Sequence, residues 1–361
     1  MAPSSEMSAK LGKLEERLGT EWTAIRKAGE HTRERRSELQ ELFRDVSAPD
    51  TSLVVFGSVA RNEFTSGSDI DWILLIDGQS IPEHKDQEHA VARRLTGEDG
   101  TFKRPGTSGV FGRMVGSHGL VHNIGGEDDL NSNTTRRILL LLESLPIGNR
   151  EAYDRVRRQI IRRYLDDDRG LTHGSGDTRV PRFLLNDLTR YWRTVTVDFV
   201  YKQRADEGEK WALRNAKLRM SRKLIFAAGL AHVFLCHMDP AAECARNELR
   251  EKRSVTQLTA YLEQQLKSTP LEVIANACLV LQIPDGTVRN IFDNYNKFLS
   301  ILDDSDKRKE LESVRSDEDL RKSPLWKEIS RISHPFHEGL VSLFLRDNEE
   351  LSKLTMEYGV F

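Results

Sequence analysis

The segment VVFGSVARNEFTSGSDIDWILLI, residues 54–76, decides the fold class. It begins with a short β-branched run that ends at Gly57 and Ser58, and it closes with an apolar run that follows Asp69 and Asp71. Apolar runs bounded by glycine and serine predict two strands, the second buried on both faces beyond its acidic start. Between the strands we expect a glycine turn and a short helix.

Asp69 and Asp71 are the candidate metal ligands. In an extended strand residues two apart point to the same side, so both carboxylates would share one face while Ile70 turns into the core. Carboxylates held this close repel each other unless a cation lies between them. Mg²⁺ commonly takes one or two protein carboxylates and completes its shell with substrate phosphates and water. We therefore expect Mg²⁺, or Mn²⁺, at this pair.

The turn at Gly57 and Ser58 is the candidate phosphate site. Glycine lets a phosphate approach the backbone closely, and free N–H groups with the serine hydroxyl can donate to its oxygens. Arg61 and Asn62 follow and could add donors. Together these residues would hold a nucleoside triphosphate for in-line displacement at its α-phosphate. The GxxxxGK[ST] pattern is absent, which argues against P-loop chemistry.

The same stretch resembles the signature of the DNA polymerase β-type nucleotidyltransferase superfamily, in which Gly-Ser precedes Asp-apolar-Asp by about ten residues. It is most similar to the bacterial regulatory branch that includes the uridylyltransferase and adenylyltransferase of nitrogen control. Residues 134–156, TTRRILLLLESLPIGNREAYDRV, are similar to the helix after the catalytic region of that uridylyltransferase. The resemblance covers residues 50–78 well and 117–160 loosely. It implies a mixed sheet, Asp69 and Asp71 as metal ligands, and Gly57 and Ser58 at the triphosphate.

The sequence departs from that family in its third carboxylate. Many members carry one on a later strand, yet no acidic residue occurs here between Asp99 and Glu127. Asp128 and Asp129 are candidates, although GGEDDLNSN favours a loop or a helix cap. The chain also has no His-Asp dipeptide, so the hydrolase activity that accompanies the uridylyltransferase is not expected.

The flanking sequence predicts an α+β protein with a small mixed-sheet nucleotidyltransferase domain. An amphipathic helix over 8–46 gives an N-terminal helical segment, 1–47, followed by the catalytic domain at 48–130 and an all-helical acceptor domain at 131–361. Residues 97–133 are rich in Gly, Ser and Asn and give no clear pattern. Beyond them, helices are predicted from 134, with further ones at 150–165, 181–205, 209–235, 255–267, 270–282, 288–303 and 325–345.

Composition limits the classes of protein that fit. The 361 residues carry 54 Lys and Arg against 56 Asp and Glu, which excludes a wholly basic nucleic-acid coat. Three scattered cysteines, most simply buried helix residues, cannot form a disulfide framework, and no apolar run is long enough for a membrane span. The start of the chain does not read as a secretory signal. We therefore expect a cytoplasmic protein.

The helical part has local charge and aromatic residues that bear on the acceptor. Residues 179–223 hold twelve Lys and Arg against five acidic residues, a surface that suits phosphate or nucleic acid. Tyr191, Trp192 and Arg193 could hold a base and its phosphates, although helix core with solvated charge is the simpler interpretation. His118 and His122, four residues apart, make only a weak zinc pair.

The prediction is an Mg²⁺-dependent nucleotidyltransferase, EC 2.7.7-type, that moves a nucleoside monophosphate from a triphosphate such as ATP to an acceptor. A protein, an RNA end, a small molecule and a second nucleotide all stay open as acceptors. The alternative is a catalytically silent nucleotide-binding or nucleic-acid-binding regulatory module.

Overall fold

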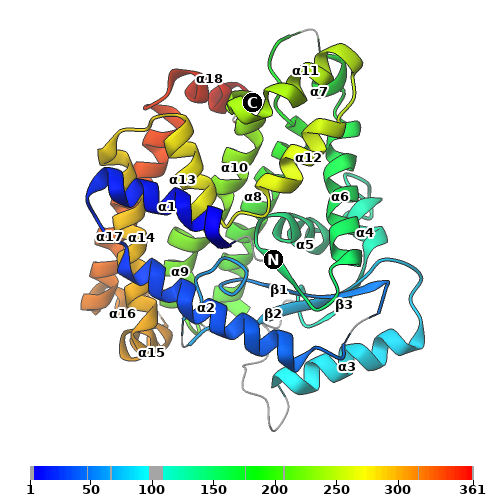
Figure 1. Ribbon diagram of the computed structural model, residues 1–361. Coiled ribbons are helices and arrows are strands. Elements are labelled where there is room, and N and C mark those ends of the chain that lie inside the picture. The colour runs from blue at the N-terminus through cyan, green and yellow to red at the C-terminus, as the bar shows by residue number, and fades with distance from the viewer. Residues whose placement is uncertain are drawn as a thin grey trace.

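A computed structural model describes residues 4–46, 48–65, 67–96, 109–174, 176–205, 208–315 and 317–359. It confirms the α+β class: one four-stranded sheet lies at the edge of a largely helical molecule (Figure 1). Of the stretch with no clear sequence pattern, residues 97–108 lie outside the described residues.

The sheet is mixed, as predicted, with the order β3-β2-β1-β4. Its two inner strands are β1 (Thr51–Phe56) and β2 (Asp71–Ile76), which pair antiparallel. Strand β3 (Arg113–Gly116) runs parallel to β2, and β4 (Ser144–Ile147) runs antiparallel to β1. The two strands expected from residues 54–76 are therefore the centre of the sheet.

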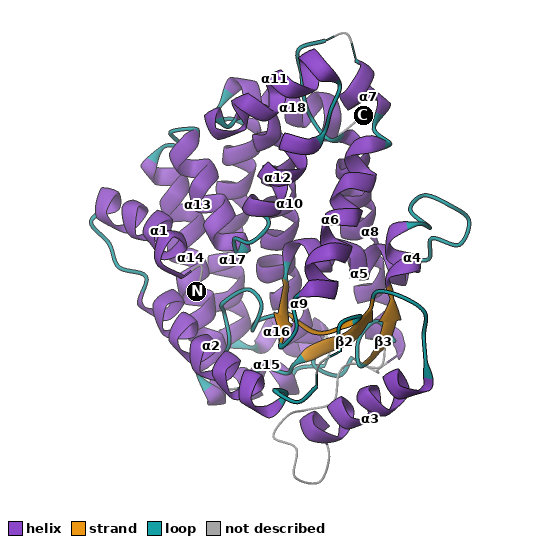
Figure 2. Ribbon diagram, turned by 45° about the vertical axis from the view of Figure 1, so that its right-hand side comes forward, coloured by secondary structure: helices purple, strands orange, loops and turns teal. Residues whose placement is uncertain are grey.

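Both faces of the sheet are covered, which explains the uninterrupted apolar run of β2. Leu53 and Leu74 pack on one face with residues of α2 (Thr23–Leu42) and α3 (Pro82–Thr96). Val54 and Ile73 face the opposite side, where they join the large core of the helical region. Figure 2 shows α3 on one side of the sheet and most of the helices on the other. The helical region therefore closes over one face of the strands.

The N-terminal segment forms two helices, so the prediction of one helix over 8–46 is wrong. Helix α1 (Ser4–Leu18) ends at Gly19, whose φ of +59° is the left-handed conformation that stops a helix, and α2 starts at Thr23. Trp22 lies in the break with 2% of its surface exposed, and its indole N–H donates to Asp293 at 2.8 Å. The break thus lets α1 pack on α13 and α2 on α14.

The fourth strand comes from a segment with an apolar, helix-like sequence. Helix α5 (Asn131–Leu142) ends within the Leu-rich run, and Ser144–Ile147 becomes β4 through pairing with β1. Pairing with a strand some ninety residues earlier overrides the local helical pattern here. Glu143 is consequently placed at the junction between α5 and the sheet.

The helical region continues to the end of the described chain. Its helices after the short α4 (Ser117–Val121) and α5 are α6 (Glu151–Asp166), α7 (Arg169–His173), α8 (Arg182–Ala205), α9 (Trp211–Lys217), α10 (Lys223–Met238), α11 (Glu243–Lys252), α12 (Thr256–Gln265), α13 (Pro270–Val280), α14 (Asp285–Asp303), α15 (Ser305–Ser313), α16 (Asp317–Lys322), α17 (Pro324–Leu345) and α18 (Glu349–Gly359). A 3₁₀ turn, η2 (Pro240–Ala242), precedes α11. Most of the predicted helices are present within a few residues, and α4, α7, α11, α15, α16 and α18 are additions to them.

Helix α9 joins α10 through a π-helical turn, η1 (Leu218–Arg222), instead of the continuous helix expected over 209–235. In an α-helix two residues five positions apart point about 140° away from each other. A π-turn, with its hydrogen bonds from residue i to i+5, brings such residues toward one face. Lys217 and Arg222 are related in this way.

Two further expectations about the chain can be compared with the structure. Cys236 and Cys278 are buried helix residues as expected, whereas Cys244 is exposed. Among the described residues, no single helix has the length and apolar character needed to cross a membrane; Trp211–Met238 and Pro240–Lys252 meet that test only as a pair bent by 63°.

Candidate active site

The pairing of β1 with β2 brings the glycine turn next to the second aspartate. Phe56, the last residue of β1, lies opposite Asp71, the first residue of β2. A Cβ atom on Gly57 would lie 3.6 Å from Asp71 Oδ2, so that carboxylate faces the turn. Gly57 has φ of +73°, a conformation that favours glycine. The phosphate-site and metal-ligand candidates therefore meet at one end of the two central strands.

The alternation of β2 sets which way the carboxylates face. Ile70, 1% exposed, joins the core beneath α2 and α3 together with Trp72. Asp71 lies on the opposite face, the one that carries Ile73 toward the helical region. Asp69 precedes the strand, which begins at Asp71 and not two residues earlier as expected. Both aspartates are half-buried.

The two carboxylates interact electrostatically. Burial, and next the charge of Asp69, raise the pKa of Asp71 to about 7. Burial alone would raise the pKa of Asp69 as well, but the positive charge of Lys217, a backbone hydrogen bond and the charge of Arg308 together outweigh it and hold that pKa below its ordinary value. Asp69 is therefore ionised, while Asp71 resists ionisation. A cation bound between the two carboxylates would remove this repulsion and favour the ionised form of both.

A set of basic residues from the helical region surrounds the carboxylates. Lys217 ends α9 and Arg222 ends the π-turn η1, and the positive charge of each favours ionised Asp71. Burial lowers the pKa of Lys217, although the nearby Asp69 opposes that shift. Arg308, from α15, bonds Thr65 Oγ1 at 3.3 Å in the loop before Asp69. The site thus has acidic side chains at the start of β2 and basic side chains from the helical region around them.

Arg61 belongs to a buried ion-pair network behind the glycine turn. Its Nε donates to Glu63 at 2.8 Å, and its Nη1 donates to Glu143. Glu143 also accepts from Arg222 Nη1 at 3.3 Å, and only 1% of its side chain is exposed. Glu143 therefore links the turn after β1 to the π-turn of the helical region.

The segment after Gly57 is a pair of hydrogen-bonded turns, not the short helix expected. Arg61 N–H donates to the Gly57 carbonyl at 3.0 Å, and Glu63 N–H donates to that of Ser58 at 2.8 Å. Asn62, with φ of +65°, cannot continue a helix. No described residue bonds the Ser58 hydroxyl, which leaves it free to meet a ligand.

The structure supplies no third carboxylate from β3. The strand pairs with β2 in the register Ile73 to Arg113, so a basic residue begins it. Across the described residues no group of three or more His, Cys, Asp or Glu side chains could hold a metal ion. The residues present fit a hard divalent cation that takes two protein carboxylates and leaves its other positions to substrate oxygens and water.

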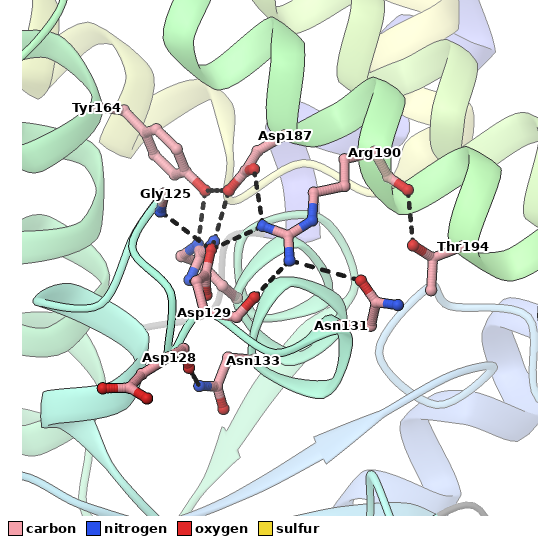
Figure 3. Close-up of polar contacts among 10 residues, drawn as sticks. Gly125, Asp128, Asp129, Asn131, Asn133, Tyr164, Asp187, Arg190 and Thr194 are labelled. Atoms are coloured by element: carbon pink, nitrogen blue, oxygen red, sulfur yellow. Dashed lines mark hydrogen bonds and ion pairs between the residues drawn. The ribbon is translucent and has the colours of Figure 1, made fainter.

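Asp129, a candidate for that third role, belongs to a separate buried network (Figure 3). Its side chain is fully buried and bonds Arg137 at 2.8 Å, Arg190 at 2.9 Å and the Gly125 N–H at 3.1 Å. Burial would raise the pKa of Asp129, but these partners hold it below its ordinary value. The carboxylate is therefore committed to helix packing. The described hydrogen bonds of Asp128 are made by its backbone carbonyl, which accepts from the Leu130 N–H at 2.9 Å and from the Asn133 side chain at 3.5 Å.

Of the α8 residues singled out by sequence, Tyr191 is a core residue and Arg193 is exposed, as the simpler interpretation had it, whereas Trp192 is half-buried. Tyr191 is fully buried, and Trp192 stacks on Phe226 with ring centres 5.3 Å apart. His118 and His122 lie with their rings 5.0 Å apart at α4, outside any metal cluster among the described residues.

Sequence reasoning missed the convergence of Glu143, Lys217 and Arg222 on the aspartates. Residues 134–156 and the basic stretch 179–223 carried a signal, since each stood out by sequence. Neither pattern indicates which of its residues points toward Asp71, because that depends on β4 pairing and on the π-turn.

The comparisons with known proteins agree with this site. Residues 33–95 match the family model described as a nucleotidyltransferase domain, a region that contains β1, the glycine turn, both aspartates and β2. No curated protein and no solved structure is significantly similar to the chain. The match supports the polymerase β-type nucleotidyltransferase superfamily for the sheet region of this protein.

Proposed function

We propose that this protein is a metal-dependent nucleotidyltransferase that transfers a nucleoside monophosphate from a nucleoside triphosphate to an acceptor, releasing pyrophosphate. The observation that carries the proposal is the approach of the Asp71 carboxylate to the glycine turn: its Oδ2 lies 3.6 Å from where a Cβ of residue 57 would be. The negative charge of Asp69 is close enough to raise the pKa of Asp71. The nucleotidyltransferase-domain match over residues 33–95 gives independent support.

In this proposal the residues have separate tasks. Asp69 and Asp71 hold Mg²⁺ or Mn²⁺, which supplies charge neutralisation at the phosphates and helps orient the reacting oxygens. The Gly57 and Ser58 turn donates hydrogen bonds to the triphosphate. Lys217 contributes positive charge from the helical side, where the pyrophosphate leaving group gains negative charge. Arg61, through Glu63 and Glu143, keeps the turn in place.

The test is turnover with each of the four ribonucleoside triphosphates, labelled at the α-phosphate, with Mg²⁺. Asp69→Asn and Asp71→Asn are each expected to lower the rate of pyrophosphate release at least a hundredfold while circular dichroism and Tm show a folded protein. Asp86→Asn, an exposed position on α3, is the matched control and should retain the wild-type rate. Undiminished turnover by Asp71→Asn would refute the proposal.

The same assay assigns the acceptor class. A labelled product from nucleotides alone indicates a nucleotide acceptor, and a labelled protein band indicates a protein acceptor. Label on added RNA or on an added small molecule indicates the remaining classes. The excess of basic residues in 179–223 supports an acceptor that carries phosphate.

A catalytically silent nucleotide-binding module is the second candidate. It is favoured by one observation: among the described residues no third carboxylate joins Asp69 and Asp71 in a group that could hold a metal ion, because Glu143, the acidic residue whose charge reaches Asp71, is bound by Arg61 and Arg222. Such a module would bind a triphosphate with Mg²⁺ and depend on Asp71 for that binding, yet release no pyrophosphate with any acceptor.

A further inference from the structure

A pocket of about 630 Å³ lies along α8, away from the glycine turn and the paired aspartates. Its walls come from the middle of α8, from Asn131 at the start of α5, and from Tyr358 and Gly359 at the end of α18. None of the residues assigned to the nucleotide or metal lines it. Its volume falls within the range of about 300–1,000 Å³ typical of small-molecule sites.

The described residues that line the pocket include two arginines, Arg190 and Arg193, against one acidic residue. Arg193 is exposed there, and no described residue pairs with its guanidinium. The one acidic residue of the lining, Asp198, is already bound by Lys202 at 2.7 Å. Arg182 adds a further cation at the rim, with its guanidinium carbon 4.5 Å from the centre of the Tyr358 ring.

Arg190 is held in position at the inner wall. Its Nη1 bonds Asp129 at 2.9 Å and its Nη2 bonds the Asp129 carbonyl, so the guanidinium is fixed before any ligand arrives (Figure 3). The two arginines of this network, Arg137 and Arg190, balance the charges of Asp129 and Asp187. The network is therefore neutral, and the unmatched charge is that of Arg193 and Arg182.

The remaining walls suit a flat polar group. Asn186 is exposed with no described side-chain bond, so its amide offers both donors and an acceptor. Tyr358 supplies an aromatic ring, and Val197, 69% exposed, supplies apolar surface. Guanidinium groups recognise phosphate in paired hydrogen bonds, and an amide beside an aromatic ring suits a heterocycle.

We propose that this pocket is a second ligand site, which binds a phosphate-bearing small molecule of mononucleotide size through the unpaired charge of Arg193, with Arg190 as a fixed neighbouring donor, and without a metal ion. The neighbour of Arg190 on α8 is Tyr191, which is buried beside Arg222 and Glu143 behind the candidate active site. A ligand in the pocket therefore contacts the helix that also supports the catalytic side.

The test is isothermal titration of the full chain with AMP, GMP, CMP, UMP and inorganic pyrophosphate, in EDTA to remove divalent metal. At least one of the nucleotides is expected to bind with one site per chain, and its parent nucleoside is expected to bind at least tenfold more weakly. Arg193→Ala should weaken binding tenfold or more, because a charge-assisted contact to phosphate is lost. Arg204→Ala removes an exposed arginine of the same helix outside the pocket, and should leave the affinity unchanged.

Two further variants locate the site. Asn186→Ala is expected to weaken the nucleotide but not pyrophosphate, because the amide faces the heterocycle. Asp71→Asn should leave metal-free binding intact, whether or not the proposed catalysis is correct. The proposal is overturned if no probe binds, if Arg204→Ala weakens binding as much as Arg193→Ala, or if binding is lost in Asp71→Asn and retained in Arg193→Ala.

Discussion

Glu143→Gln tests whether the link between the glycine turn and the π-turn stabilises the fold. Glu143 bonds Arg61 and Arg222, and its side chain and that of Arg61 are 1% and 9% exposed. Removing one partner of a buried ion pair costs about 3–5 kcal/mol. Arg61 keeps its bond to Glu63, and 31% of the Arg222 side chain is exposed, so we expect the lower end, about 3 kcal/mol.

This free energy translates into a measurable change in melting temperature. At about 2.1 cal/mol/K per residue, a chain of this length has an unfolding entropy near 0.8 kcal/mol/K, so the loss lowers Tm by about 4 °C. Differential scanning calorimetry of the wild-type protein and of Glu143→Gln measures this difference in Tm. Glu349→Gln is the control, because Glu349 forms an exposed pair with Lys353, and its Tm should change by about 1 °C or less. If Glu143→Gln and Glu349→Gln melt at the same temperature, the link that Glu143 makes between the glycine turn and the π-turn does not stabilise the fold.

Three further predictions concern the turn, the aspartate pair and the buried network. Gly57→Ala places a side chain at φ of +73°, which costs about 1–2 kcal/mol, and its methyl group, in van der Waals contact with Asp71 at 3.6 Å, would occupy space that a phosphate at this turn needs, so turnover should fall at least tenfold. Gly116→Ala, with open space around its Cβ, should change neither the free energy of unfolding measured with urea nor the turnover rate. The affinity for Mn²⁺, measured by electron paramagnetic resonance, should fall up to about tenfold per pH unit below pH 7, because a proton on Asp71 must leave before the metal binds. Above pH 8 the affinity should be constant. An affinity that does not change between pH 5 and 8 would contradict the raised pKa of Asp71. Asp129→Asn should destabilise the protein by about 3 kcal/mol, because Arg137 is fully buried, while the rate per folded molecule stays within twofold; a hundredfold loss of rate would instead make Asp129 a catalytic carboxylate.

The local features of the fold could be predicted from the sequence because they depend on neighbours in the chain. The apolar runs around Val54 and Ile73 predict strands, and the glycine at 57 predicts the bend between them. Thr269 and Pro270 mark the start of α13, where the Glu272 carboxylate accepts the Thr269 N–H at 2.8 Å. These signals lie within a few residues of the structure they specify.

Other features depend on contacts between distant parts of the chain. The run LLLLESLPI has a helical composition, and its second half becomes a strand only because β1 offers an edge to pair with. The break at Gly19 is fixed by Trp22 packing next to Asp293, some 270 residues later. Such contacts leave no periodic pattern in the sequence.

The candidate site divides in the same way. Gly57, Ser58, Asp69 and Asp71 form a motif of fixed spacing that the sequence reveals by itself. The basic side of the site depends on one extra residue per turn in η1, which directs Lys217 and Arg222 to the same side. A count of charges in residues 179–223 predicts a cationic surface but not which two side chains reach the aspartates.

The most direct test of the metal site is a crystal structure with Mn²⁺ and a triphosphate whose α,β-bridging oxygen is replaced by methylene. Anomalous diffraction should show Mn²⁺ bound by oxygens of both Asp69 and Asp71, with the triphosphate against Gly57 and Ser58. A triphosphate bound elsewhere, or a metal that contacts neither aspartate, would contradict the assignment of this site.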